Sequence, residues 1–141
     1  MSEIADFLRA RYAEQRVIAE AAAEHAGTRD WRYRPGSDHV AAVQSFPNDV
    51  PARRELWTPL VTEAGSYIGD TIDDEIGNHI AAHDPAAVIA DLDAKLAIVD
   101  LCATFLHDDD RGIDPCAEGT LCLLAQPFAG HSGHRGEEWA P

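Results

Sequence analysis

The chain of 141 residues contains 45% hydrophobic residues and carries a formal net charge of −14, and residues 61–141, with 16 acidic and 3 basic side chains, contribute −13 of it. A field of this sign repels nucleic-acid backbones, so direct nucleic-acid binding is not expected, and no apolar run approaches the roughly 20 residues that span a membrane. The three cysteines, an odd number, argue against a disulfide framework, and the N-terminus has no signal-peptide pattern, so we predict one cytoplasmic domain over residues 1–141.

The first predicted element is a helix over residues 1–27, which Gly27 ends. Its expected apolar side comprises Ile4, Phe7, Leu8, Val17, Ile18 and Ala22. Over residues 28–72 short runs with alternating polarity are separated by turns rich in Pro and Gly, which predicts a small antiparallel β-meander. Strands are expected at 31–33, 39–44 and 56–62, with a short further strand within 65–70. Pro59 should restrict the third strand to an edge or a bulge.

Residues 73–126 are predicted to be mainly helical, with a sharp corner at Asp84-Pro85. Asp73 or Asp74 should cap a short helix that ends near His83. Beyond the corner, Asp84 can cap a second helix, and Pro85 suits its first position. Two apolar stripes predict that this second helix is long and buried on two sides. One stripe comprises Ile89, Leu92, Leu96, Val99, Ala103 and Leu106, and the other comprises Ile98, Leu101, Cys102 and Phe105.

The last predicted helix covers residues 116–125, and an irregular tail follows over residues 127–141. Phe128 and Trp139 are expected to hold this tail against the body of the protein. The predicted fold class is therefore α+β: an N-terminal helix, a small antiparallel β-meander, then two or three C-terminal helices packed around one buried helix.

The segment His79–Val88, with the sequence HIAAHDPAAV, resembles the HIARHDPARV signature of a family of small uncharacterised proteins from actinobacteria and their phages. The opening DFLRAR at residues 6–11 and the tail, with LLAQPFAGH at 123–131 and EEWAP at 137–141, are similar to the ends of the same family. The resemblance spans most of the chain and implies no established activity. Ala82, Ala87 and Leu96 stand where the family usually carries Arg, so a basic helix face in relatives would be weakened here.

Two histidines are the candidate metal ligands. His79 and His83 are four residues apart, so a helix over 73–83 places both imidazoles on one face, a spacing that can bind zinc. A third ligand would come from Cys116, Cys122, His131 or His134, which also form a second set at spacings unlike the common structural zinc sites. A metalloprotease would need Glu after the first His, where Ile80 stands. The alternative is that both histidines serve the architecture of the corner.

The sequence does not match the common motifs for calcium binding or for catalysis. A calcium loop that begins at Asp108 would need Gly and Glu where Ile113 and Gly119 stand. There is no GxSxG motif, no Walker A loop and no GxGxxG motif. We therefore predict a non-enzymatic acidic accessory or interaction protein with no cofactor and an unidentified protein partner, associated with a phage or prophage as the resemblance implies. Two alternatives stay open: a zinc-binding domain that uses His79 and His83, and an acidic nucleic-acid mimic that acts on a DNA-binding host protein.

Overall fold

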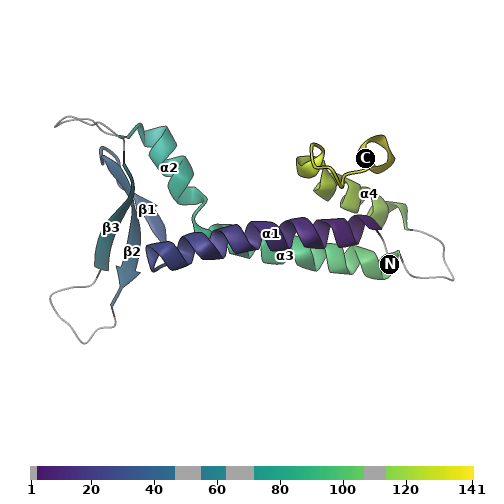
Figure 1. Ribbon diagram of the computed structural model, residues 1–141, viewed down its shortest axis with the longest axis horizontal. Coiled ribbons are helices and arrows are strands. Elements are labelled where there is room, and N and C mark those ends of the chain that lie inside the picture. Colours follow the sequence, from purple (N-terminus) through teal and green to yellow (C-terminus); the bar gives the residue numbers. More distant parts are fainter. Residues whose placement is uncertain (1–2, 47–54, 63–71, 107–113) are drawn as a thin grey trace. The chain divides into compact units, whose positions relative to one another are not determined.

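The computed structural model describes residues 3–46, 55–62, 72–106 and 114–141. The chain divides into two compact units, one formed by residues 17–90 and the other by residues 1–16 together with 91–141. Helices α1 (Glu3–Ala26) and α3 (Pro85–Phe105) contribute to both units (Figure 1). The α+β class is confirmed, while the single-domain organisation stays a prediction. Within the described ranges, no helix is long and apolar enough to cross a membrane.

The unit of residues 17–90 is built on a three-stranded antiparallel sheet in the order β1 (Trp31–Tyr33), β2 (His39–Ser45) and β3 (Glu55–Thr62). The central strand is buried over residues 40–43, as its run of small and branched apolar side chains requires. The pairing of β2 with β3 shifts at Pro59, which confirms the predicted edge strand with an irregularity. The strand predicted within 65–70 lies outside the described residues.

Helix α2 (Asp74–Ala82) packs against β1 and β2 of the same unit. The Asp73 carboxylate caps the helix by accepting from the N–H of Glu75 at 3.2 Å. On the buried side of α2 a side chain larger than that of Gly77 would not fit, because a Cβ atom there would lie 2.5 Å from the ring of Tyr33. The short helix and its predicted cap are thereby confirmed.

The corner at Asp84-Pro85 also forms as the sequence predicts. One carboxylate oxygen of Asp84 accepts from the N–H of Ala87 at 2.7 Å and caps α3, whose first residue is Pro85. The other oxygen accepts from the N–H of Trp31 at 3.2 Å. Asp84 therefore joins the start of α3 to the first strand of the sheet.

The other unit is helical. The N-terminal part of α1 lies antiparallel to α3, since Arg9 binds Asp100 at 2.8 Å and Arg16 binds Asp93. Helix α4 (Pro115–Ala125) begins with a cap from Asp114, whose carboxylate accepts from the N–H of Cys116. The largest fully buried side chains of this unit are Leu8, Leu92, Val99 and Leu121.

The C-terminal tail contains two short 3₁₀ helices, η1 (Gln126–Phe128) and η2 (Gly136–Trp139). Their aromatic residues surround Phe7 of α1, at ring-centroid distances of 6.0 Å for Phe128 and 5.1 Å for Trp139. Trp139 is 7% exposed. The predicted anchoring of the tail by these two aromatic residues is confirmed.

The structure corrects two predictions of burial. Helix α3 is covered on one side, where Ile89, Leu92 and Val99 are buried, but not on the other, where Leu101 is 59% exposed. The long helix is therefore not buried on two sides, because the described part of its unit supplies packing elements to one side only.

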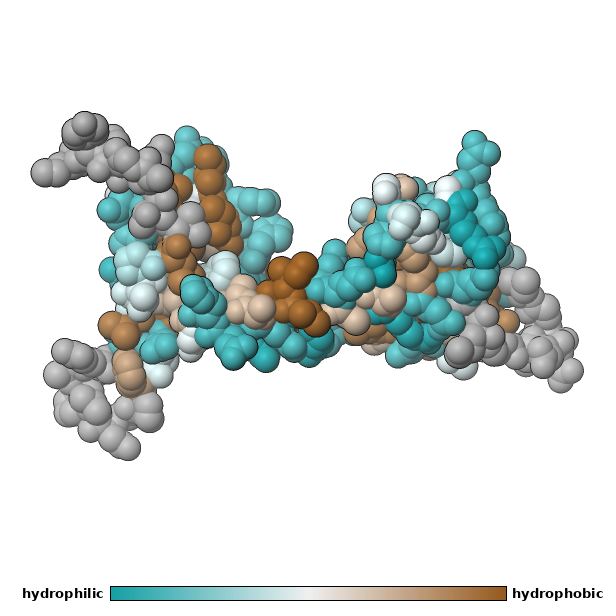
Figure 2. All heavy atoms as spheres, in the orientation of Figure 1, coloured by the Kyte–Doolittle hydropathy of each residue, from teal (hydrophilic) through white to brown (hydrophobic). Residues whose placement is uncertain are grey.

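The second correction concerns α1. Val17 and Ile18 are 65% and 70% exposed, because the buried side of the helix runs instead through Tyr12, Ala19 and Ala23. Figure 2 shows hydrophobic residues at the surface near the middle of α1, between hydrophilic neighbours.

Candidate functional site

The two histidines predicted to bind metal lie at the end of α2 and are exposed. Their ring centroids are 4.4 Å apart, and Nδ1 of His83 lies 2.8 Å from the backbone oxygen of His79. The described part of the chain contains no group of three or more His, Cys, Asp or Glu side chains placed to hold a metal ion. The geometry of His83 is that of a side chain bonded back to the last turn of its own helix.

The proposed third ligands lie in the helical unit and have other contacts. Cys116 is exposed in the first turn of α4, whereas Cys122 is buried, and burial raises the pKa of its thiol. Nδ1 of His131 accepts from the N–H of Gly133 at 3.0 Å. Nδ1 of His134 accepts from the N–H of Gly136 at 2.9 Å, and both imidazoles pack against Phe7. These bonds fix the two histidines within the turns of the tail.

Charged side chains of the sheet surround the indole of Trp57. The indole N–H of Trp57 donates to Glu55 at 3.1 Å, and Arg32 donates to Glu55 and to Asp30 at 2.9 and 2.6 Å. The hydrogen bond from Trp57, followed by that from Arg32, lowers the pKa of Glu55. Arg34 adds its guanidinium group 3.9 Å from the centroid of the Trp57 ring. The indole is thus held at its N–H edge and covered by a cation.

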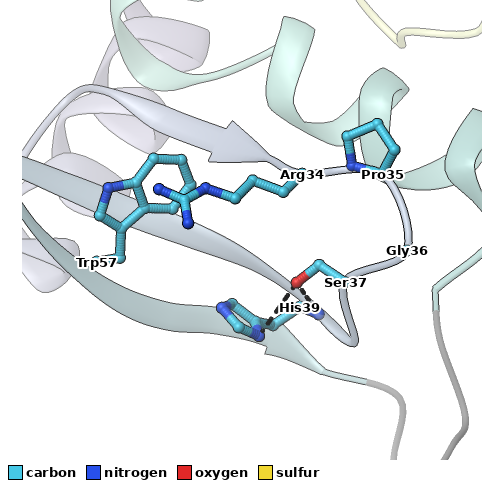
Figure 3. Close-up of a pocket in the computed structure, with 6 residues that line it drawn as sticks. All are labelled: Arg34, Pro35, Gly36, Ser37, His39 and Trp57. Carbon is cyan, nitrogen blue, oxygen red and sulfur yellow. Dashed lines mark hydrogen bonds between the residues drawn. The ribbon is translucent and has the colours of Figure 1, made fainter.

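A pocket of about 290 Å³ opens beside this stack. It is lined by Arg34, Pro35, Gly36, Ser37, His39 and Trp57, and Figure 3 shows the Arg34 guanidinium over the indole with Ser37 and His39 on the neighbouring strand and turn. In the described part of the chain, Arg34 has no carboxylate partner, whereas Arg32 has two. The pocket therefore contains a stacked guanidinium whose N–H donors are not used by any carboxylate of residues 3–46, 55–62, 72–106 and 114–141.

The polar side chains of this pocket do not form a Ser-His-Asp triad. Nδ1 of His39 lies 2.6 Å from Asp38 and 3.4 Å from the hydroxyl of Ser37. In a triad the hydroxyl and the carboxylate bind opposite ring nitrogens, so that the imidazole can accept a proton from the nucleophile. Here both approach the same nitrogen, so Asp38, His39 and Ser37 do not have the geometry of a triad.

Helix α3 carries three exposed large apolar side chains. Ile98, Leu101 and Phe105 are 40%, 59% and 49% exposed and follow one another at helical spacing. The exposed residues Ala94 and Ala97 continue the same side of the helix. We call these five residues the apolar face of α3. Such a face on a helix normally packs against another element.

Carboxylates border the apolar face along both edges. Helical geometry places Asp91 beside Ile98 on one edge and Asp93 and Asp100 on the other. Each pairs with a cation of its own unit, namely Lys95, Arg16 and Arg9, yet their side chains remain 56%, 58% and 65% exposed. The face is thus an apolar strip bordered by one carboxylate on one edge and two on the other, all paired with cations but still accessible.

Sequence reasoning missed both features. The apolar residues of α3 were recognised, but their periodicity does not say whether an element of the same chain covers them. The pocket depends on the pairing that brings β3 beside β2, which places Trp57 within reach of a residue 23 positions earlier. The signal that was available is the alternation at 31–33, continued by Arg34, which puts Arg32 and Arg34 on the same side of an extended chain.

Comparison with models of protein families matches residues 1–141 to one described as "Family of unknown function (DUF6221)". Comparison with curated proteins and with solved structures gives no match.

Proposed function

Since the chain belongs to the DUF6221 family, for which no function is known, we propose its function from its own residues: it is a small acidic, non-enzymatic interaction protein that binds a basic protein partner along the apolar face of α3. The observation that carries the proposal is the exposure of Ile98, Leu101 and Phe105 on one side of a single helix. In line with the resemblance of residues 79–88, we extend the proposal to a cytoplasmic accessory protein associated with a phage or prophage.

Burial of the apolar face would supply the favourable free energy of binding. Removing apolar surface from water contributes about 25 cal/mol per Å², and a few well-packed side chains near the centre of an interface contribute most of the binding free energy. Leu101 lies between Ile98 and Phe105, so a partner helix laid along α3 would contact all three. An amphipathic helix that packs its apolar side on an apolar surface is a common mode of recognition.

Charge selects the kind of partner. Asp91, Asp93 and Asp100 border the face, and the whole chain carries −14. A second copy would bring two such charges together, and the repulsion would oppose association. A partner with an apolar centre and a rim of Lys and Arg would instead place opposite charges along both edges, which favours encounter and orientation. We therefore commit to a basic amphipathic surface rather than to a homodimer.

The test uses a designed helical peptide of about 20 residues, roughly 30 Å long, with a leucine stripe flanked by lysines. A second peptide carries glutamate in place of each lysine. Fluorescence anisotropy at low and at physiological ionic strength should show binding of the lysine peptide and its weakening by salt, because exposed charges are screened within about 8 Å at 0.15 M. Equal binding of the glutamate peptide would overturn the proposed charge selectivity.

Two matched variants locate the binding surface. Leu101→Gln should weaken binding of the lysine peptide about tenfold, the equivalent of about 1.4 kcal/mol. Leu123→Gln, on α4, should leave this affinity unchanged, although Leu123 is 61% exposed. Equal losses in both variants would refute the assignment to α3. A nucleic-acid mimic would bind through its carboxylates and tolerate Leu101→Gln. Sedimentation that finds a dimer of the wild-type protein, lost in Leu101→Gln, would replace the basic partner with a second copy.

A further inference from the structure

The unit of residues 17–90 contains a second feature that the proposed function does not use, the pocket beside Arg34 and Trp57. We propose that this pocket binds a small ligand that carries an oxyanion, either a phosphomonoester or a carboxylate, with Arg34 as the charged donor. The inference is independent of partner binding by α3, because it rests on other residues and on another kind of ligand.

The first step of the argument is the state of the Arg34 guanidinium. Its carbon lies 3.9 Å from the centroid of the Trp57 ring, so one flat face of the group is stacked. Stacking uses the face and leaves the N–H donors at the edge of the group, in a planar fork that fits two oxygens of a phosphate or a carboxylate. Within the described residues, no carboxylate occupies that fork.

The second step is the rigidity of the platform. Glu55 fixes the indole by accepting from its N–H, and it is itself bound by Arg32. Arg32 pairs with both Glu55 and Asp30, so these three side chains together carry a net charge of −1, and Arg34 is the cation of the pocket that no described carboxylate binds. A guanidinium that is already stacked on a fixed ring loses less side-chain entropy when it binds a ligand than a free arginine does. The network thereby prepares Arg34 for an anion.

The third step concerns the rest of the pocket. Ser37 offers a hydroxyl that can donate to a ligand oxygen, and it lies on the same wall as His39 (Figure 3). The volume of about 290 Å³ is at the lower end of the range for ligand pockets, about 300 to 1,000 Å³. The ligand is therefore expected to be small, with one anionic group and at most a single ring that can lie against the Arg34–Trp57 stack.

The negative charge of the protein does not exclude an anion here. The unit of residues 17–90, which contains every residue of the pocket, carries 12 acidic and 5 basic side chains and a net charge of −7, so the anion has to be bound by donors inside the pocket and not by the charge of the unit. Charges farther away than about 8 Å are largely screened at physiological ionic strength. Two carboxylates lie beside the pocket, and each is held by bonds of its own: Asp38 by His39, and Asp74 by Tyr33 and the N–H of Gly36.

The experiment titrates the full-length protein with phenyl phosphate, inorganic phosphate, benzoate and phenol. Binding is followed by the NMR signals of the indole N–H groups, and that of Trp57 is assigned with Trp57→Phe. We expect saturable shifts of the Trp57 signal with a Kd on the order of 1–10 mM, as befits a single anchoring group. Whichever of phenyl phosphate and benzoate binds with the lower Kd identifies the class of anion. If phenol binds as tightly as phenyl phosphate and benzoate do, the pocket recognises the apolar ring and not the anion, and the proposal is overturned.

Arg34→Gln is the test variant, and Arg29→Gln, which removes the same charge from another exposed position of this unit, is its matched control. Arg34→Gln should raise the Kd at least about tenfold, whereas the Kd of Arg29→Gln should stay within about twofold of the wild-type value. Arg34→Lys, which keeps the charge without the planar fork, should be intermediate. Equal losses in both glutamine variants, or no shift of the Trp57 signal in well-folded protein, would overturn the proposal. Circular dichroism of each variant checks the fold.

Discussion

The hydroxyl of Tyr33 donates a hydrogen bond of 2.7 Å to the carboxylate of Asp74 and thereby joins β1 to the first turn of α2. The same carboxylate oxygen accepts from the N–H of Gly36 at 2.9 Å, in the turn that follows β1. These bonds, led by that from Tyr33, lower the pKa of Asp74. The ionised carboxylate is therefore the form that the folded protein prefers.

The first prediction concerns the pH dependence of this contact. Because the folded-state pKa of Asp74 is depressed, its contribution to stability is present above the unfolded-state pKa of about 3.9 and is lost as pH falls through the folded-state value. Asp74→Asn should therefore lower the free energy of unfolding near neutral pH, and its difference from wild type should shrink below about pH 4. Urea denaturation of the wild type and of Asp74→Asn across this pH range measures the loss of stability near neutral pH and its decrease in acid.

Asp73→Asn is the control for this prediction, because Asn caps a helix about as well as Asp does. It keeps the cap of α2 and leaves the Tyr33–Asp74 bond in place. The explanation fails if the deficit of Asp74→Asn is the same at every pH.

The second prediction concerns Gly77, the point of closest approach between α2 and Tyr33. Alanine at an ordinary helix position is about 1 kcal/mol more favourable than glycine. At Gly77, however, the added Cβ would lie 2.5 Å from the Tyr33 ring, and overpacking of this kind costs about 1–3 kcal/mol. Gly77→Ala should thus destabilise the protein in urea denaturation.

Gly119 in α4 provides the opposite case. A Cβ added there meets no atom within 4 Å, so Gly119→Ala should stabilise by up to about 1 kcal/mol. If both substitutions stabilise, Tyr33 does not pack against α2 as closely as described.

The third prediction separates the two sides of α3. Val99 is fully buried, so Val99→Ala should cost about 2–3 kcal/mol of unfolding free energy through lost contacts and a residual cavity. Leu101 is 59% exposed, so Leu101→Ala should change the free energy by no more than about 0.5 kcal/mol. Chemical denaturation of dilute protein gives both values. A large cost for Leu101→Ala that grows with protein concentration would reveal a second copy on this face.

Much of the backbone could be predicted because the relevant signals are local. Gly27 ends α1 with a φ of +72°, a conformation that glycine adopts without strain, and Asp84 with Pro85 starts α3. Turn residues and alternation likewise located the three described strands. Each of these signals acts within a few residues along the chain, so no tertiary information was needed to read it.

The candidate sites depend on contacts that the sequence does not encode locally. Periodicity identified Leu101 and Phe105 as apolar but could not show that the described part of the chain leaves them uncovered. The stack of Arg34 on Trp57 requires the strand pairing, and the exposure of Val17 requires knowing which side of α1 faces a neighbour. The imidazoles of His79 and His83 lie 4.4 Å apart, as their spacing of four predicts, although His83 follows the last residue of α2. A third metal ligand, in contrast, is a tertiary property.

The last prediction concerns the contact of Phe7 with Trp139, which joins the two ends of the chain within the helical unit. Trp139 is 7% exposed, and truncation of a buried aromatic residue costs about 3–5 kcal/mol, so Trp139→Ala should greatly lower the free energy of unfolding. Glu137→Ala, at an exposed position in the same 3₁₀ helix, should change the free energy of unfolding by no more than about 0.5 kcal/mol.

A double-mutant cycle with Phe7→Ala then isolates the direct contact between the rings. Since the centroids lie 5.1 Å apart in a tilted arrangement, a coupling energy of about 0.5–1.5 kcal/mol is expected. If Trp139→Ala costs no more than Glu137→Ala, the tail does not contribute to the core. A coupling near zero, with both single losses large, would instead mean that each ring is stabilised by its other neighbours, namely Phe128 for Phe7 and His134 for Trp139.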